Sequence, residues 1–208
     1  MAFLTQSTTA LIAIANPIGA VPIFLTMTEG TTAAERTHRA RQAVVAVTAI
    51  LVATALFGRL VLGMFGLSLD AFRAAGGLVI LLMGLEMLRG ERTRVQAPHP
   101  DVEREEREVL ADSIVVPFAM PMIAGPGAIT TTMTLASQAD GVVGHALLFA
   151  AIGALAVVLA LALRSARAVD HALGPRGQRI FLRFMGLILL TLGAQFLLSG
   201  ARDYLLAT

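Results

Sequence analysis

The feature that most limits how this chain can fold is a series of long apolar stretches that carry almost no charged residue. A helix needs about 20 mostly apolar residues to cross the hydrocarbon core of a bilayer. Six stretches are suitable: residues 1–28, 42–58 (continuing past Arg59 to Leu69), 71–88, 113–139, 141–163 and 184–201. We therefore predict an all-α integral membrane protein with six transmembrane helices.

The composition excludes several other classes of protein. Only 14% of the 208 residues are charged, whereas soluble domains average about 25%, so the apolar surface could not be covered in water. All 16 basic residues are arginine, and they do not gather around stacking aromatic side chains, so we expect no nucleic-acid partner. There is no cysteine, and the four histidines lack a second ligand at metal spacing. We expect neither a metal nor a cofactor.

The arginines are distributed unevenly across the predicted membrane. The connections at 27–42, 89–112 and 164–183 lie on one side and hold thirteen of the sixteen arginines. The opposite side has only Arg59, Arg73 and Arg202. Because short cytoplasmic loops carry an excess of arginine and lysine, the first side is predicted to be cytoplasmic and both termini periplasmic.

The two halves of the chain resemble each other at a constant offset of 109 residues. The matched positions include residues 14–17 with 123–126, Gly77 with Gly186, Gly84 with Gly193 and Glu86 with Gln195. We predict two three-helix repeats, 1–90 and 113–208, joined by a cytoplasmic linker at 91–112 within one membrane domain, 1–208. Because each repeat has an odd number of spans, the two are inverted in the membrane, which is typical of transporters.

The first and fourth predicted spans are each interrupted near the middle by proline and glycine. Pro17 lacks an N–H group and clashes with the preceding turn, so the helix is expected to break there, with Asn16 extended. Asn16 would then cap a new helix that begins at Pro17, and Gly125 and Pro126 can play the same parts in the fourth span. The N–H groups at 18–20 and 127–129 are expected to lack intrahelical partners and to favour a carboxylate or another anion.

We predict that these two breaks form the substrate-binding site; the alternative is a pair of ordinary proline kinks. The predicted site residues are Asn16, Pro17, Ile18, Gly19, Gly125, Pro126, Gly127 and Thr130. Thr131, Thr132 and Thr134 either offer hydroxyl groups to a ligand or bond back to the preceding turn.

Glu86 is the one acidic residue clearly inside a predicted span. Its expected role is pairing with Arg89, three residues further along the helix, or extension to the membrane interface. The alternative is a role in ion coupling, since intramembrane carboxylates are often functional. Gln195, the repeat counterpart of Glu86, is the second candidate coupling residue.

Five segments together carry a resemblance to a known family: NPIG at 16–19, FRAAGGL at 72–78, VPFAMP at 116–121, AGPGAI at 124–129 and RFMG at 183–186. Along nearly its whole length the chain resembles the MarC family of bacterial inner-membrane proteins. The resemblance implies six spans in the inner membrane. It also implies similarity to a wider superfamily of amino-acid exporters, some of which move small neutral amino acids such as alanine and glycine.

The functional hypothesis is a secondary transporter of small neutral amino acids or similar small zwitterions that works by alternating access, with proton or sodium coupling. The alternatives are an uncoupled channel or efflux pathway for small solutes and a non-transporting scaffold or regulatory protein. An enzyme is not expected, because the spans contain no paired acid and base groups. The expected partners are the lipid bilayer and a small-molecule substrate, and the sequence is also compatible with an oligomer.

Overall fold

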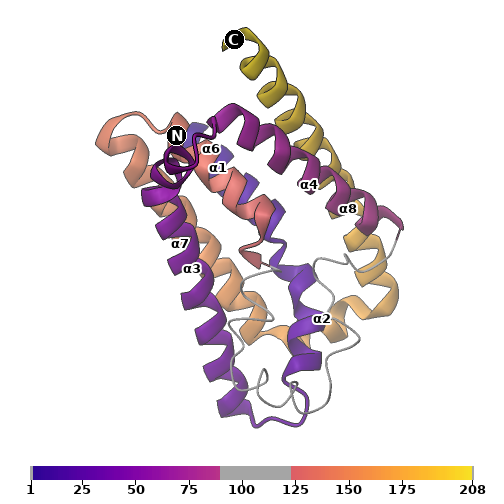
Figure 1. Cartoon of the computed structure of the whole chain (residues 1–208). Helices are drawn as coiled ribbons and strands as arrows, with labels where there is room; N and C mark the ends of the chain where they lie inside the picture. The colour runs from indigo at the N-terminus through magenta and orange to yellow at the C-terminus, as the bar shows by residue number, and fades with distance from the viewer. Residues whose placement is uncertain (1, 90–122, 208) are drawn as a thin grey trace.

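The computed structural model describes residues 2–89 and 123–207, and these residues form seven helices (Figure 1). The helices are α1 (Ala2–Ala15), α2 (Pro17–Met27), α3 (Ala33–Met64), α4 (Leu69–Arg89), α6 (Pro126–Gln138), α7 (Gly141–Arg164) and α8 (Ala166–Ala207). No strand is found in these two ranges. The predicted linker at 91–112 and the first part of the fourth predicted span, at 113–122, lie outside the described residues.

Five helical stretches in the described ranges are long and apolar enough to cross a membrane. They are Ala2–Met27, Ala33–Met64, Leu69–Arg89, Gly141–Arg164 and Arg176–Leu206. The prediction of an all-helical chain with several apolar spans is therefore confirmed. The fourth predicted span is described only from residue 123 onward, and its helical part is α6.

Two helices are longer than the apolar stretches that predicted them. The α3 helix begins at Ala33 because Thr32 caps it: the Glu35 N–H donates to the Thr32 hydroxyl, and the Thr32 N–H donates to the Glu35 carboxylate. The α8 helix begins at Ala166 and has a kink at Gly174, where φ is 57°. A positive φ is readily adopted by glycine, so the kink falls where the sequence allows it.

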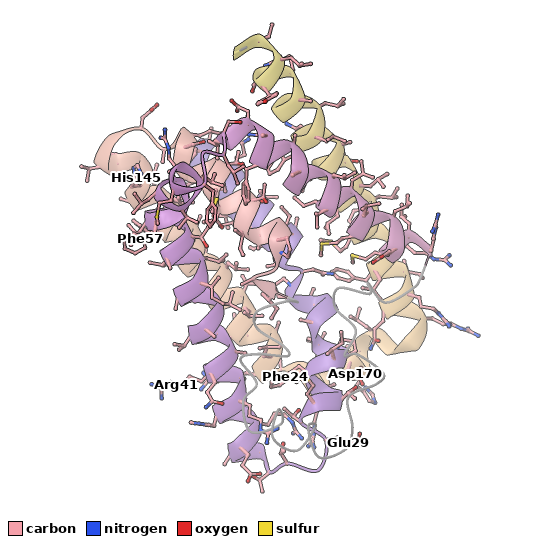
Figure 2. All side chains as sticks on the ribbon, viewed as in Figure 1. Phe24, Glu29, Arg41, Phe57, His145 and Asp170 are labelled. Atoms are coloured by element: carbon pink, nitrogen blue, oxygen red, sulfur yellow. The ribbon has the colours of Figure 1, made fainter. Side chains whose placement is uncertain are left out.

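The outer surface of the bundle is apolar, as expected of helices that contact lipid. Phe57 and Leu60 of α3 are 56% and 64% exposed, whereas Phe24 of α2 is fully buried between helices. Figure 2 shows Phe57 at the outer edge of the bundle and Phe24 within it. Large apolar side chains therefore occupy both the inside and the outside of the molecule, and a surface of this kind suits a bilayer.

The longest contact between helices joins α4 and α8, which run antiparallel (Figure 1). Glycines line this contact: a Cβ on Gly84 would lie 2.5 Å from the Leu190 nitrogen, and a Cβ on Gly186 would lie 2.9 Å from the Gly84 oxygen. Both separations are too short for a real side chain. Small residues thus allow the two backbones to touch, as is common between membrane helices.

The two ends of the molecule differ in their chemistry. The chain begins at α1 and finishes at α8 on the same end, which we call the terminal end (Figure 1). Glu29, Arg41 and Asp170 lie toward the opposite end (Figure 2). There, Arg36 and Arg39 of α3 donate to backbone oxygens of Thr28 and Met27 at 3.3 and 3.2 Å. These arginines therefore cap the last turn of α2, whose carbonyls have no partner within their own helix.

Candidate functional site

The first span is broken at a single residue, Asn16. The α1 helix ends at Ala15, and α2 begins at Pro17. Asn16 has φ 43° and ψ 61°, which is the left-handed region, so the prediction of an extended Asn16 was wrong. The left-handed turn lets the Asn16 N–H donate to the Ile12 oxygen at 3.0 Å and close the last turn of α1. Asparagine tolerates this conformation better than most residues.

The Asn16 side chain caps the helix that follows it, as predicted. The Gly19 N–H donates to Asn16 Oδ1 at 3.2 Å, and the Ala20 N–H donates to the Asn16 backbone oxygen at 3.2 Å. Gly19 and Ala20 therefore do not offer free donors, contrary to our expectation. Among the predicted donors of this break, only the Ile18 N–H finds no acceptor in the described ranges.

The second break has a more open helix N-terminus. Gly125 is the N-cap of α6, with Pro126 at the first helical position, and glycine has no side chain with which to cap the helix. The Ile129 N–H donates to the Gly125 oxygen at 3.0 Å, so the expectation of a free donor was wrong for this residue. No side chain among residues 2–89 and 123–207 caps the N–H groups of Gly127 and Ala128. The partial positive charge of a helix N-terminus is therefore less compensated at α6 than at α2.

The two breaks lie near each other, although the residues at the two breaks have different contacts. A Cβ on Gly127 would lie 3.2 Å from Ile14 Cγ2 and 2.9 Å from Ile80 Cγ1, so the start of α6 rests against the end of α1 and the middle of α4. Asn16, Pro17, Gly125 and Gly127 are buried, whereas Ile18 and Pro126 are exposed. The structure thus brings together the predicted residues on either side of the breaks but leaves Ile18 and Pro126 on the surface.

The four threonines after the second break have different surroundings. The hydroxyls of Thr131 and Thr132 donate to the Gly127 and Ala128 oxygens, each at 2.8 Å, so they bond back within α6. Thr130 packs against Gly76 of α4, where a Cβ would overlap its side chain. The Thr134 hydroxyl has no hydrogen-bond partner among the described residues, although Thr134 is only 3% exposed.

A groove of about 900 Å³ lies between α1, α4, α6 and α8 and opens toward the terminal end. Most of its surface is apolar, but nine polar or charged residues contribute to the lining: Thr5, Gln6, Thr9, Arg73, Thr134, Gln138, Gln195, Ser199 and Asp203. At its inner end the groove reaches Ala13, three residues before Asn16. The groove therefore extends from the terminal end toward the two breaks, although none of the predicted site residues at the breaks lines it.

An arginine is buried in the wall of this groove. Arg73 Nη1 lies 3.1 Å from Asp203 Oδ2 of α8 and 3.8 Å from Asp70 Oδ1. The Arg73 side chain is 12% exposed, so most of it is covered by neighbouring residues. Its Nε has no acceptor in the part of the chain that the structure describes. Arg202 also pairs with Asp203, at 2.9 Å, which gives this cluster two arginines and two aspartates.

The two candidate coupling residues lie in different places. Gln195 lines the groove. Glu86 does not line it, and the expected ion pair between Glu86 and Arg89 is absent from the described ranges, where every ion pair involves Arg73 or Arg202. Glu86 Oε2 is buried without a hydrogen-bond partner among these residues. No group of three His, Asp or Glu residues that could hold a metal is found in 2–89 or 123–207.

Sequence reasoning missed most of the groove, although a signal was present. Its polar residues recur at intervals of four: Thr5 and Thr9 on α1, Thr134 and Gln138 on α6, and Gln195, Ser199 and Asp203 on α8. Residues four apart lie on one face of a helix, so each of these sets forms a polar stripe. A search for polar stripes in the apolar spans, in addition to charges and breaks, would have found them.

Comparison with known proteins places the chain in a well-defined group. Residues 1–205 match the family described as "MarC family integral membrane protein". The chain is 38% identical over 200 residues to the UPF0056 membrane protein MJ1677 of Methanocaldococcus jannaschii, which covers 95% of each chain. It is 36% identical to YvbG of Bacillus subtilis (96% of this chain, 94% of that protein) and 32% identical to YhcE of Escherichia coli (92% and 88%). No solved structure matches.

Proposed function

This chain belongs to the MarC family of integral membrane proteins, and from that premise we propose a secondary transporter of small neutral amino acids or similar small zwitterions. The observation that carries the proposal is the polar groove, which runs from the terminal end to the turn before Asn16. Polar side chains between membrane helices commonly mark a substrate pathway. A groove with this lining and depth is a path for a small polar solute.

The proposed binding region is the pair of helix breaks, which lies beyond the inner end of the groove at Ala13. The N–H groups of Gly127 and Ala128 at the start of α6, which no side chain in the described ranges caps, would hold the substrate carboxylate. Asn16, which is 8% exposed, adds a polar side chain next to Ala13 at the groove's inner end. Because the surrounding residues are mostly alanine, isoleucine and glycine, the region favours a substrate with a small side chain.

The pattern of helix contacts supports two inverted repeats. At an offset of 109 residues, Gly186 is the counterpart of Gly77, and Gly193 is the counterpart of Gly84. In the structure Gly77 lies against Gly193, and Gly84 lies against Gly186. Each glycine thus contacts the counterpart of the other, which is the arrangement that a two-fold axis produces.

The remaining helices follow the same relation. By the offset, α2 corresponds to α6, α3 to α7 and α4 to α8. The structure pairs α2 with α8 and, correspondingly, α6 with α4; it also pairs α2 with α7 and α6 with α3. We therefore propose that the two repeats exchange conformations during alternating access, so that the groove closes at the terminal end while a matching path opens at the other.

This symmetry suggests a role for Glu86 that its position alone does not. Gln195 lines the groove at the terminal end, and Glu86 is its counterpart in the other repeat. After the repeats exchange conformations, Glu86 would line the path to the opposite side. Its Oε2, which is unpartnered in the described ranges, would then be accessible to a proton or a sodium ion. We propose Glu86 as the coupling group, with Gln195 as its uncharged equivalent.

The proposed location is the bacterial inner membrane with both termini periplasmic. The end opposite the termini holds Arg36, Arg39 and Arg41, and the positive-inside rule places such an end in the cytoplasm. On this arrangement the described groove opens to the periplasm.

The test is uptake of labelled alanine and glycine by proteoliposomes of the purified protein under imposed proton or sodium gradients. We expect accumulation beyond equilibrium that needs one gradient and is lost in Asn16→Leu and Gly127→Ala. Gly153→Ala is the matched control, because no atom lies within 4 Å of a Cβ there. Size-exclusion profiles would verify that the inactive variants are folded.

Equilibration without accumulation would favour the uncoupled channel or efflux pathway. Full activity in Asn16→Leu would show that transport does not depend on the helix breaks. If neither amino acid nor any other small zwitterion crosses the membrane, transport is refuted and a scaffold or regulatory protein becomes the better hypothesis.

A further inference from the structure

Two hydrogen-bond donors in the wall of the groove have no acceptor among the described residues. They are Arg73 Nε and Thr134 Oγ1. Both residues line the groove, and Thr134 is 97% buried, with an exposed fraction of 3%. Buried polar groups are almost always paired in native proteins, so an unpaired donor beside a cavity indicates a bound ligand or water.

The helix register places these two donors at the same depth. A Cβ on Gly76 of α4 would overlap the Thr130 side chain, so Gly76 and Thr130 face each other. The α4 helix runs inward from the terminal end, and α6 runs outward toward it (Figure 1). One turn outward from this contact is therefore Arg73 on α4 and Thr134 on α6, since residues three or four apart share a helix face.

The two donors together select one kind of ligand group. The Arg73 Nε and the Thr134 hydroxyl both lack an acceptor in the described ranges, and a carboxylate has two oxygens that can accept one hydrogen bond from each. Arg73 Nη1 is occupied by Asp203, and Asp70 is 3.8 Å away. With two aspartates and two arginines, the cluster has little net charge, which favours a singly charged carboxylate over a dianion.

We propose that Arg73 and Thr134 form an outer carboxylate site in the groove, separate from the helix breaks. The groove also has Gln195 and Ser199 of α8 and Thr9 of α1 in its lining, whose oxygens suit the ammonium group of an amino acid. The site would hold the substrate before it reaches Asn16. Its assignment to amino acids rests on the proposed function, whereas its affinity for a carboxylate does not.

The test is titration of the purified protein in lipid nanodiscs with propionate, L-alanine, ethylamine and inorganic phosphate, measured by calorimetry. We expect propionate and alanine to bind and ethylamine not to bind. In Thr134→Val the Kd for propionate should rise about tenfold or more, the effect of losing a hydrogen bond to a charged group. The melting temperature without ligand should not fall, because the deleted hydroxyl has no partner.

The matched control is Thr132→Val. Thr132 is on the same helix and fully buried, but its hydroxyl donates to the Ala128 oxygen and it does not line the groove. Its Kd for propionate should equal that of the wild type. Arg73→Lys tests the other donor: lysine can keep an ion pair with Asp203 but has no Nε–H at that position, so propionate binding should weaken there as well.

Four outcomes would overturn the outer site: no propionate binding to the wild type, wild-type affinity in Thr134→Val, equal losses in Thr134→Val and Thr132→Val, or tighter binding of phosphate than of propionate. Failure of this site is distinguishable from failure of transport. Loss of alanine binding in Gly127→Ala, together with normal binding in Thr134→Val, would overturn the outer site and support the helix breaks. Binding of propionate that depends on Thr134, in a protein that moves no solute, would support the outer site alone.

Discussion

Replacing Gly84 with alanine tests the contact that holds the two halves of the bundle together. The glycine lies in the middle of the antiparallel α4–α8 pair, which is the most extensive contact between helices in the structure. A Cβ at this position would lie 2.5 Å from the Leu190 nitrogen and 2.8 Å from the Gly186 oxygen. Both neighbours are backbone atoms, so neither can move away by rotation of a side chain.

The expected cost follows from these distances. Non-bonded carbon atoms rest about 3.5 to 4.0 Å apart, so α4 and α8 would have to separate by about 1 Å, and a gap of that size loses roughly a quarter to a half of each contact. Inserting a methyl group into a well-packed interior costs about 1 to 3 kcal/mol. Alanine recovers about 0.5 to 1 kcal/mol through its better helix propensity. The net loss is therefore about 0 to 2.5 kcal/mol, with a midpoint near 1 kcal/mol.

The assay is thermal unfolding of the purified variants in detergent micelles. A loss near 1 kcal/mol corresponds to a decrease of roughly 2 to 4 °C in Tm for a chain of this length. Gly193→Ala, the repeat counterpart, should give a similar decrease, because its Cβ would lie 2.7 Å from the Gly77 oxygen. Gly153→Ala, in open space, should keep or raise Tm. If Gly84→Ala melts no lower than Gly153→Ala, the close helix contact is not a source of stability.

Three further results are expected. Asn16→Gly keeps the left-handed turn and should cost only a few tenths of a kcal/mol, whereas Asn16→Leu also adds about 1 to 2 kcal/mol of backbone strain; equal thermal stabilities would contradict this. Asp203→Asn leaves Arg73 with only the more distant Asp70 and should lower stability by about 1 to 3 kcal/mol, less than a fully buried pair because the groove admits water; an unchanged Tm would remove the pair from the account. Glu86→Gln should abolish accumulation against a gradient in proteoliposomes but preserve exchange of alanine, and accumulation at the wild-type level would exclude Glu86 as the coupling group.

The first helix break could be predicted from the sequence because its cause is local. Pro17 has no N–H, and its ring clashes with the preceding turn, so a helix is expected to break there, although Pro22 is accommodated inside α2. The sequence did not reveal that Asn16 turns left-handed, because this depends on its N–H completing α1 while its side chain caps α2. Because the Gly19 N–H donates to the Asn16 side chain, it is not available to a ligand. A rule about single residues does not say which of two competing bonds is made.

The groove depends on contacts between distant parts of the chain. Arg73 and Asp203 are 130 residues apart, and no spacing rule predicts that they pair. Thr132 and Thr134 belong to one short run of threonines, yet one bonds back within α6 and the other faces the groove without a partner in the described ranges. Only the position of α6 against α4 separates them. Helix packing therefore decides which residues of a sequence motif are available to a ligand.

In the proposed transporter, the places where the two proposed repeats differ would bear on the direction of transport. Two identical inverted halves would give inward-open and outward-open states of equal energy, so any preference must come from positions that the repeat does not preserve. Arg73 is such a position: its counterpart is Leu182, and its pair with Asp203 can stabilise the groove at the terminal end only. Glu86 and Gln195 form another, which puts an ionisable group on one path and a neutral amide on the other. In such a carrier the glycine contact between the helices would be the same in both states, but the charges at the two ends would differ. A proton or sodium gradient could therefore act on one state alone.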